Sequence, residues 1–87
     1  MAEIRLNSNA VSWREVDGEV IALGYESSSY LATNASGALL WKSLAEGTSR
    51  EALIALLVDD YDVEETHAQA DVDAFLNSLA AQGLLAA

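Results

Sequence analysis

The sequence contains no cysteine and no proline, and only four of its 87 residues are basic. Without cysteine the chain has no disulfide, no thiolate metal site and no cysteine nucleophile. Long apolar stretches are also missing, because the run that ends at Val58 is far shorter than the about 20 residues needed to span a membrane. No basic segment leads into an apolar block at the N-terminus. We therefore expect no secretory signal and a reducing, cytoplasmic location.

What the sequence does contain is a hydrophobic fraction of 52%. That fraction excludes a disordered tail. The length suits one small domain over residues 1–87, with a modest core. Since disulfides are excluded, we expect the stability of this domain to come from side-chain packing.

Negative charge dominates the composition: fourteen acidic residues against four basic ones give a net charge of −10. Residues 51–87 contain eight acids and no Lys or Arg. Nucleic-acid affinity comes largely from Lys and Arg at phosphates, so we expect no nucleic-acid partner. A basic or neutral peptide suits such a surface better, although an acidic surface also serves solubility alone.

The first third of the chain has the pattern of β-strands. Residues 11–16 are rich in β-formers, and Asp17-Gly18 is a strong signal for a hairpin turn. Residues 19–23 return as the second strand, and Tyr30 to Thr33 form a short third strand. Residues 3–6 could pair as an additional strand.

From Asn34 onwards the apolar residues follow a helical spacing. Asn34 and Ser36 are N-cap residues for a first helix, which Glu46-Gly47 ends. The stretch Thr48-Ser49-Arg50-Glu51 has the form of a capping box, in which the Thr48 side chain caps the Glu51 amide. This box predicts the start of a second helix.

Asp62 and Glu65 repeat the capping pattern for a third helix, and Gly83 is its expected C-cap. Three strands followed by three helices predict an α+β fold, in which the helices lie behind a three-stranded antiparallel sheet. The last two helices form a helix-turn-helix-like corner, so the domain is expected to be winged-helix-like. A DNA-binding role is disfavoured, because the helix that would serve as the recognition helix carries acidic residues and no Lys or Arg.

Residues that could carry chemistry are few. Glu64 and Asp71 flank His67, the only histidine, at a spacing that could complete a weak metal site, but an exposed surface histidine is the favoured interpretation. Ser27-Ser28-Ser29 has no base beside it in the sequence, and residues 59–62 lack the Gly and distal Glu of a calcium loop. We therefore expect no enzyme activity, no metal and no cofactor.

Two features of the sequence favour a peptide receptor. The strand at Tyr30, Leu31, Ala32 and Thr33 comes last in the meander, so it should lie at a sheet edge with unpaired backbone groups. The last helix has a broad apolar stripe. An extended peptide can add to such an edge and place alternate side chains toward such a helix. The competing interpretation is that both faces are ordinary core.

One set of residues recurs in order along nearly the whole chain, from about residue 4 to residue 85. Its members are residues 13–20, Tyr30-Leu31-Ala32-Thr33-Asn34, Gly37, Leu40-Trp41, Leu44, Gly47, residues 71–76, Leu79 and residues 83–85. This set resembles the PqqD-like proteins, and most closely the free-standing precursor-recognition proteins of lasso peptide biosynthesis, although no single motif in it is decisive. Where the family often has Leu before the Asn, this chain has Thr33.

The resemblance implies a recognition element for ribosomally made precursor peptides, with a leader peptide lying between the third strand and the third helix. The implied partners are that leader, a transglutaminase-like leader peptidase and a lactam-forming cyclase. Related proteins instead serve pyrroloquinoline quinone maturation, where the partner is a radical S-adenosylmethionine enzyme. The implied peptide-binding residues are Tyr30, Leu31, Ala32 and Thr33 on the strand, and Asp71, Val72, Phe75, Leu76 and Leu79 on the helix.

Overall fold

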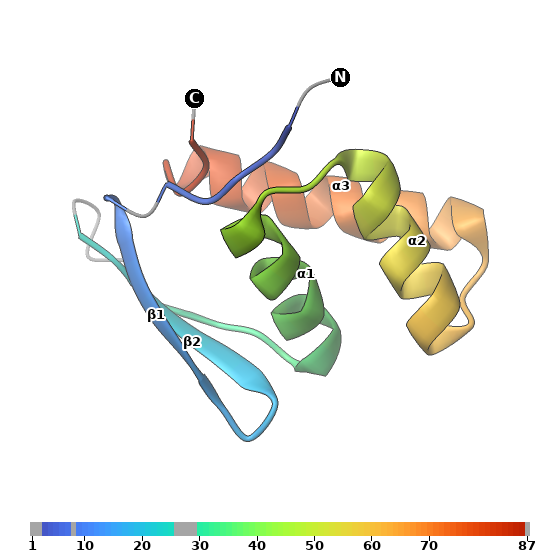
Figure 1. Ribbon diagram of the computed structural model, residues 1–87, viewed down its shortest axis with the longest axis horizontal. Coiled ribbons are helices and arrows are strands. Elements are labelled where there is room, and N and C mark those ends of the chain that lie inside the picture. The colour runs from blue at the N-terminus through green and yellow to red at the C-terminus, as the bar shows by residue number, and fades with distance from the viewer. Residues whose placement is uncertain (1–2, 8, 26–29, 87) are drawn as a thin grey trace.

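In the computed structural model of the protein, residues 3–7, 9–25 and 30–86 are described. The described elements follow one another as three strands and then three helices, which confirms the predicted α+β fold (Figure 1). Their bounds are β1 (Val11–Val16), β2 (Glu19–Gly24), β3 (Tyr30–Ala32), α1 (Ala35–Glu46), α2 (Arg50–Tyr61) and α3 (Glu65–Ala81). Ser27-Ser28-Ser29, which the sequence disfavours as a nucleophile, lies outside the described residues.

The sheet is an antiparallel meander in the order β1-β2-β3. Asp17 and Gly18 join β1 to β2 with φ angles of 52° and 81°. Two successive positive φ values are the requirement of a type I′ turn, whose twist matches that of the flanking strands. The register pairs Trp13 with Ala22 and Ala22 with Leu31, so these side chains share one face of the sheet.

The helices lie on one side of the sheet: α1 packs against β2 and α2, and α3 packs against α2 (Figure 1). Val20 and Ala22 of β2 and Trp41 and Leu44 of α1 are buried in the core between these layers. The rings of Trp13 and Trp41 meet edge to face, with centroids 6.0 Å apart. Trp41 is fully buried, whereas Trp13 is only partly so.

The segment before β1 does not extend the sheet. Ile4 forms an isolated bridge with Thr48, and Leu6 forms another with Leu85. The chain before β1 therefore crosses the start of α2 and the end of α3, and both edges of the described sheet remain β1 and β3.

The predicted cap of α2 is wrong by one residue. Ser49, and not Thr48, is the N-cap, and its side chain accepts a hydrogen bond from the Ala52 amide at 3.2 Å. The reason is tertiary: Thr48 exchanges two backbone hydrogen bonds with Ile4, which hold it extended. Of the two residues predicted to cap α1, Asn34 is the N-cap and accepts from the Gly37 amide at 2.9 Å, whereas Ser36 lies within the first turn and donates its hydroxyl to Asn34.

Asp62 does not cap α3 as the sequence suggested. It ends α2 instead, in the left-handed conformation with φ 51°, and Glu64 precedes α3 without a side-chain cap. At the other end of α3 the C-cap is Gln82, one residue before the predicted Gly83, and Gly83 follows it with φ 73° and lets the chain reverse. Leu84 then donates its amide to the Leu79 carbonyl at 3.0 Å, and Leu84 packs into the core.

Candidate peptide-binding site

One edge of the sheet is open in the described structure. β3 pairs with β2 on one side, and no described residue forms a backbone hydrogen bond with its other side. The strand is three residues long and carries neither Lys nor Pro, the residues that discourage pairing at an edge. An added strand would therefore meet free donors and acceptors here.

The backbone groups of β3 that face outward can be assigned from one hydrogen bond. Thr33 donates its amide to the Val20 carbonyl at 2.9 Å, so Thr33 faces β2. Hydrogen-bonding pairs alternate along an antiparallel ladder. Leu31 therefore also faces β2, and the amides and carbonyls of Tyr30 and Ala32 point to the open edge.

The side chains of β3 alternate as well. Tyr30 is 68% exposed and lies with Ala32 on the face of the sheet that the helices do not cover. Leu31 lies opposite the buried Ala22 and packs against the core on the helical side. Thr33 points the same way as Leu31, and its hydroxyl oxygen accepts the Val20 amide at 3.1 Å.

The five predicted residues of α3 divide into two groups. Val72 and Leu79 are core side chains, with 0% and 1% of their surface exposed. Asp71 is exposed, while Phe75 and Leu76 are partly buried and pack against the core. Only Asp71, Phe75 and Leu76 can touch a partner in this conformation. Val72 and Leu79 instead pack α3 against the core of the domain.

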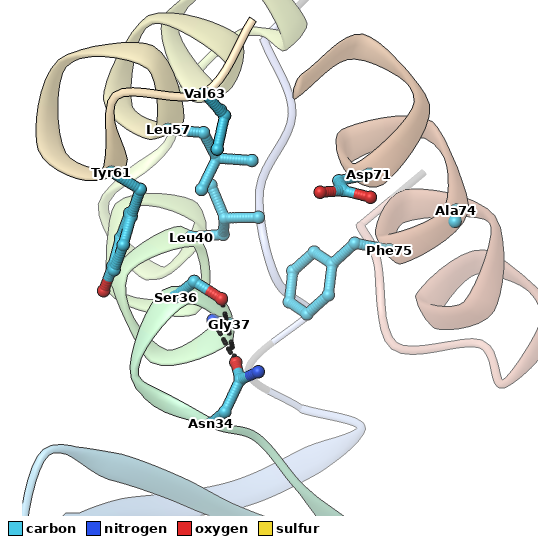
Figure 2. Close-up of a pocket in the computed structure, with 10 residues that line it drawn as sticks. All are labelled: Asn34, Ser36, Gly37, Leu40, Leu57, Tyr61, Val63, Asp71, Ala74 and Phe75. Carbon is cyan, nitrogen blue, oxygen red and sulfur yellow. Dashed lines mark hydrogen bonds between the residues drawn. The ribbon is translucent and has the colours of Figure 1, made fainter. Parts of the chain in front are cut away.

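A pocket of about 570 Å³ lies between α1, α2 and α3 (Figure 2). Phe75 and Asp71 project into it from α3, facing Leu40, Leu57 and Val63. These two are the only predicted site residues that line it. The complete lining is Asn34, Ser36, Gly37, Leu40, Leu57, Tyr61, Val63, Asp71, Ala74 and Phe75.

The pocket begins where β3 ends. Asn34, the residue after Thr33, lines the pocket and caps α1 with its side-chain oxygen, which also accepts a hydrogen bond from Ser36 at 2.9 Å. A Cβ atom added at Gly37 would lie only 2.9 Å from the Thr33 Cβ. The absent side chain of Gly37 thus allows the end of the edge strand to lie against the first turn of α1.

One ion pair connects the two helices that flank the pocket. Arg50, at the start of α2, donates from Nε and Nη2 to the two carboxylate oxygens of Asp73 on α3, at 2.7 and 3.0 Å. These hydrogen bonds lower the pKa of the Asp73 carboxyl and raise that of Arg50. The bidentate geometry fixes the spacing of α2 and α3 at this point.

Asp71 lies beside the single histidine of the sequence. His67 lies on the surface with Nε2 3.2 Å from the Asp71 carboxylate, one helical turn away. No group of three or more metal-ligating side chains gathers anywhere in residues 3–7, 9–25 and 30–86. α3 has no Lys or Arg, the side chains that neutralise phosphates in nucleic-acid complexes.

The pocket residues on α1 and α2 were not predicted as site residues. Leu57 and Tyr61 lie one helical turn apart on α2, but helical spacing alone cannot show that Leu57 is buried while Tyr61 stays 43% exposed. The useful signal was Asn34, whose place directly after the edge strand and at the start of α1 puts it beside both elements.

None of the described helices has the length and apolar character to cross a membrane. The fold and its open edge beside a helix-lined pocket define an α+β domain of winged-helix-like type. Over residues 19–85 the chain matches the family described as coenzyme PQQ synthesis protein D (PqqD). The protein therefore belongs to the PqqD family.

Two solved structures are closely similar to this chain. One is TbiB1 in complex with the TbiA(beta) leader peptide, with a TM-score of 0.85, 28% identity and 93% of each chain covered. The other is a lasso peptide synthetase B1 complexed with its leader peptide, with a TM-score of 0.83, 30% identity, 99% of this chain and 100% of that chain covered. A comparison with curated proteins finds no significant match.

Proposed function

We propose that this protein captures the leader of a ribosomally synthesised precursor peptide by adding it as a strand to β3. The observation that carries the proposal is the open edge of β3 ending at a pocket that contains Phe75. Support comes from the two similar structures, each of which holds a leader peptide. Membership of the PqqD family supports the same role in peptide maturation.

The leader would pair with the backbone groups of Tyr30 and Ala32. Strand addition draws its affinity from main-chain hydrogen bonds and its specificity from alternate side chains. Leader side chains on the helical side of the sheet would point toward Phe75 and Leu76. The peptide-binding residues that we propose are Tyr30, Leu31, Ala32, Thr33, Asp71, Phe75 and Leu76, with Val72 and Leu79 as their buried support.

We propose further that the protein acts in lasso peptide biosynthesis and carries out no chemistry itself. It would present the bound leader to a transglutaminase-like leader peptidase and to a lactam-forming cyclase. Holding the precursor near these enzymes raises its effective concentration without any new catalytic group. The similarity to a lasso peptide synthetase B1 favours this pathway.

The second candidate is a PqqD-type peptide chaperone for a radical S-adenosylmethionine enzyme, which the description of the family favours. Neighbouring genes separate the two candidates. A short precursor, a peptidase and an asparagine-synthetase-like cyclase beside this gene indicate a lasso pathway. A radical S-adenosylmethionine enzyme in their place indicates the second candidate.

The proposal is tested with the synthetic leader of the precursor encoded beside this gene. Ala32→Pro removes an amide that faces the open edge, so it should abolish leader binding. Ala32→Val keeps that amide on the same exposed position and should bind the leader as the wild type does. Circular dichroism establishes that both variants are folded. Full affinity in a folded Ala32→Pro variant would contradict strand addition at β3.

A further inference from the structure

The pocket at the end of the edge strand has one charged group in an apolar wall. Of its ten lining residues only Asp71 is charged, and its carboxylate projects into the same space as the Phe75 ring (Figure 2). Opposite it lie Leu40, Leu57 and Val63, which offer no polar side-chain atom.

Lys and Arg side chains of the protein do not neutralise Asp71. Three of the four basic side chains form ion pairs with other carboxylates. Arg50 pairs with Asp73, Lys42 pairs with Glu15 at 3.1 Å, and Arg5 pairs with Glu3 at 3.2 Å. Arg14, the fourth base, lies on β1, at the other edge of the sheet. Within the described residues the ion-pair partner of Asp71 is His67, which carries a charge only when protonated.

A peptide side chain that enters this pocket comes close to the Asp71 carboxylate, whose side chain is 57% exposed, and displaces part of its water. Removing water from a carboxylate costs free energy unless a cation or donor replaces it. A Lys or Arg near the guest's apolar side chain would supply that replacement, whereas an Asp or Glu there would be repelled. Repulsion of peptides that carry an Asp or Glu at this position is an effective source of specificity.

We propose, on the basis of the function proposed above, that Asp71 makes this protein selective for peptides that carry a Lys or Arg beside the apolar residue that fills the pocket. The substrate class is thus a leader with a cation next to its anchor residue. Asp71 acts as a specificity residue, and Phe75 with the apolar wall supplies the anchor contact.

The experiment uses random linear peptides displayed on phage, selected separately on the wild type, Asp71→Asn and Asp71→Lys. Glu65→Gln is the matched control, because it also removes one negative charge from α3 but lies outside the pocket. Selection on the wild type and on Glu65→Gln should enrich peptides with Lys or Arg at a fixed distance from an apolar residue. Selection on Asp71→Asn should show no such preference. Selection on Asp71→Lys should enrich peptides with Asp or Glu at that position.

A quantitative arm uses one selected peptide and its analogue with norleucine in place of the Lys. The replacement should weaken binding to the wild type by about two- to fivefold, the range of a solvent-accessible ion pair, and leave binding to Asp71→Asn nearly unchanged. An equal loss in both proteins, or enrichment of hydroxyl side chains at that position, would overturn the role of Asp71 and leave the proposed function standing. Failure of every variant to enrich a peptide would contradict the proposed function itself.

Discussion

Gly37→Ala should destabilise this protein, although the same change stabilises most helices. Alanine is favoured over glycine inside a helix by roughly 0.5–1 kcal/mol. In this fold the new Cβ would lie 2.9 Å from the Thr33 Cβ, where carbon atoms normally stay about 3.5–4.0 Å apart. Thr33 cannot move freely, because its amide and its hydroxyl oxygen are both hydrogen-bonded to Val20, at 2.9 and 3.1 Å.

The expected size of the effect follows from these two opposing contributions. Overpacking of this kind costs about 1–3 kcal/mol, so after the helical gain of roughly 0.5–1 kcal/mol the net loss should lie between about 0 and 2.5 kcal/mol, with a middle value of about 1 kcal/mol. In a domain of this size each kcal/mol lowers Tm by about 4–8 °C. Leader affinity should fall too, because Thr33 directly follows β3, the strand that we propose as the binding edge.

Denaturant unfolding measures the stability of Gly37→Ala, and amide NMR shifts of Val20 and Thr33 show whether the end of β3 has moved. Ala55→Gly, on the exposed face of α2, is the control that measures the ordinary difference between the two residues. A Gly37→Ala variant that is more stable than the wild type, with unchanged shifts at Thr33, would refute the close packing of β3 against α1.

Two further predictions concern α3. Phe75→Ala should weaken leader binding by more than about 1 kcal/mol, because it removes an anchor contact. Asn77→Ala, on the exposed side of the same helix, should leave leader binding unchanged. Equal leader affinity of the folded Phe75→Ala variant and the wild type would show that Phe75 is not part of the site. Asp73→Asn should lower Tm at neutral pH, because the pKa of Asp73 is lowered in the folded state and its ion pair is present above the ordinary Asp value of about 3.9. The difference in Tm should disappear as the pH falls through the lowered pKa; a difference that persists in acid would mean that the ion pair is not its cause.

Local features of the chain were predictable from the sequence. The Asp17-Gly18 turn and the Asn34 cap depend on residues close in sequence, and both were predicted correctly. The cap of α2 was not, because Thr48 is held by Ile4, far away in the sequence. Local propensity could not reveal that long-range pairing.

The candidate site was predictable only in part, for a similar reason. The edge position of β3 follows from the order of the strands, and the apolar stripe of α3 follows from its spacing. The spacing does not show that Val72 and Leu79 point into the core while Phe75 faces a pocket. That distinction depends on how α1 and α2 pack against α3, as does the contribution of Tyr61 to the pocket.

The most direct test of strand addition is amide hydrogen exchange at β3, measured with and without a saturating leader peptide. The amides of Tyr30 and Ala32 should exchange much more slowly in the complex, because they would donate to the added strand. The Leu31 amide faces β2 and should change far less. Unchanged exchange at both Tyr30 and Ala32 in a saturated complex would contradict the claim that the leader binds as a fourth strand.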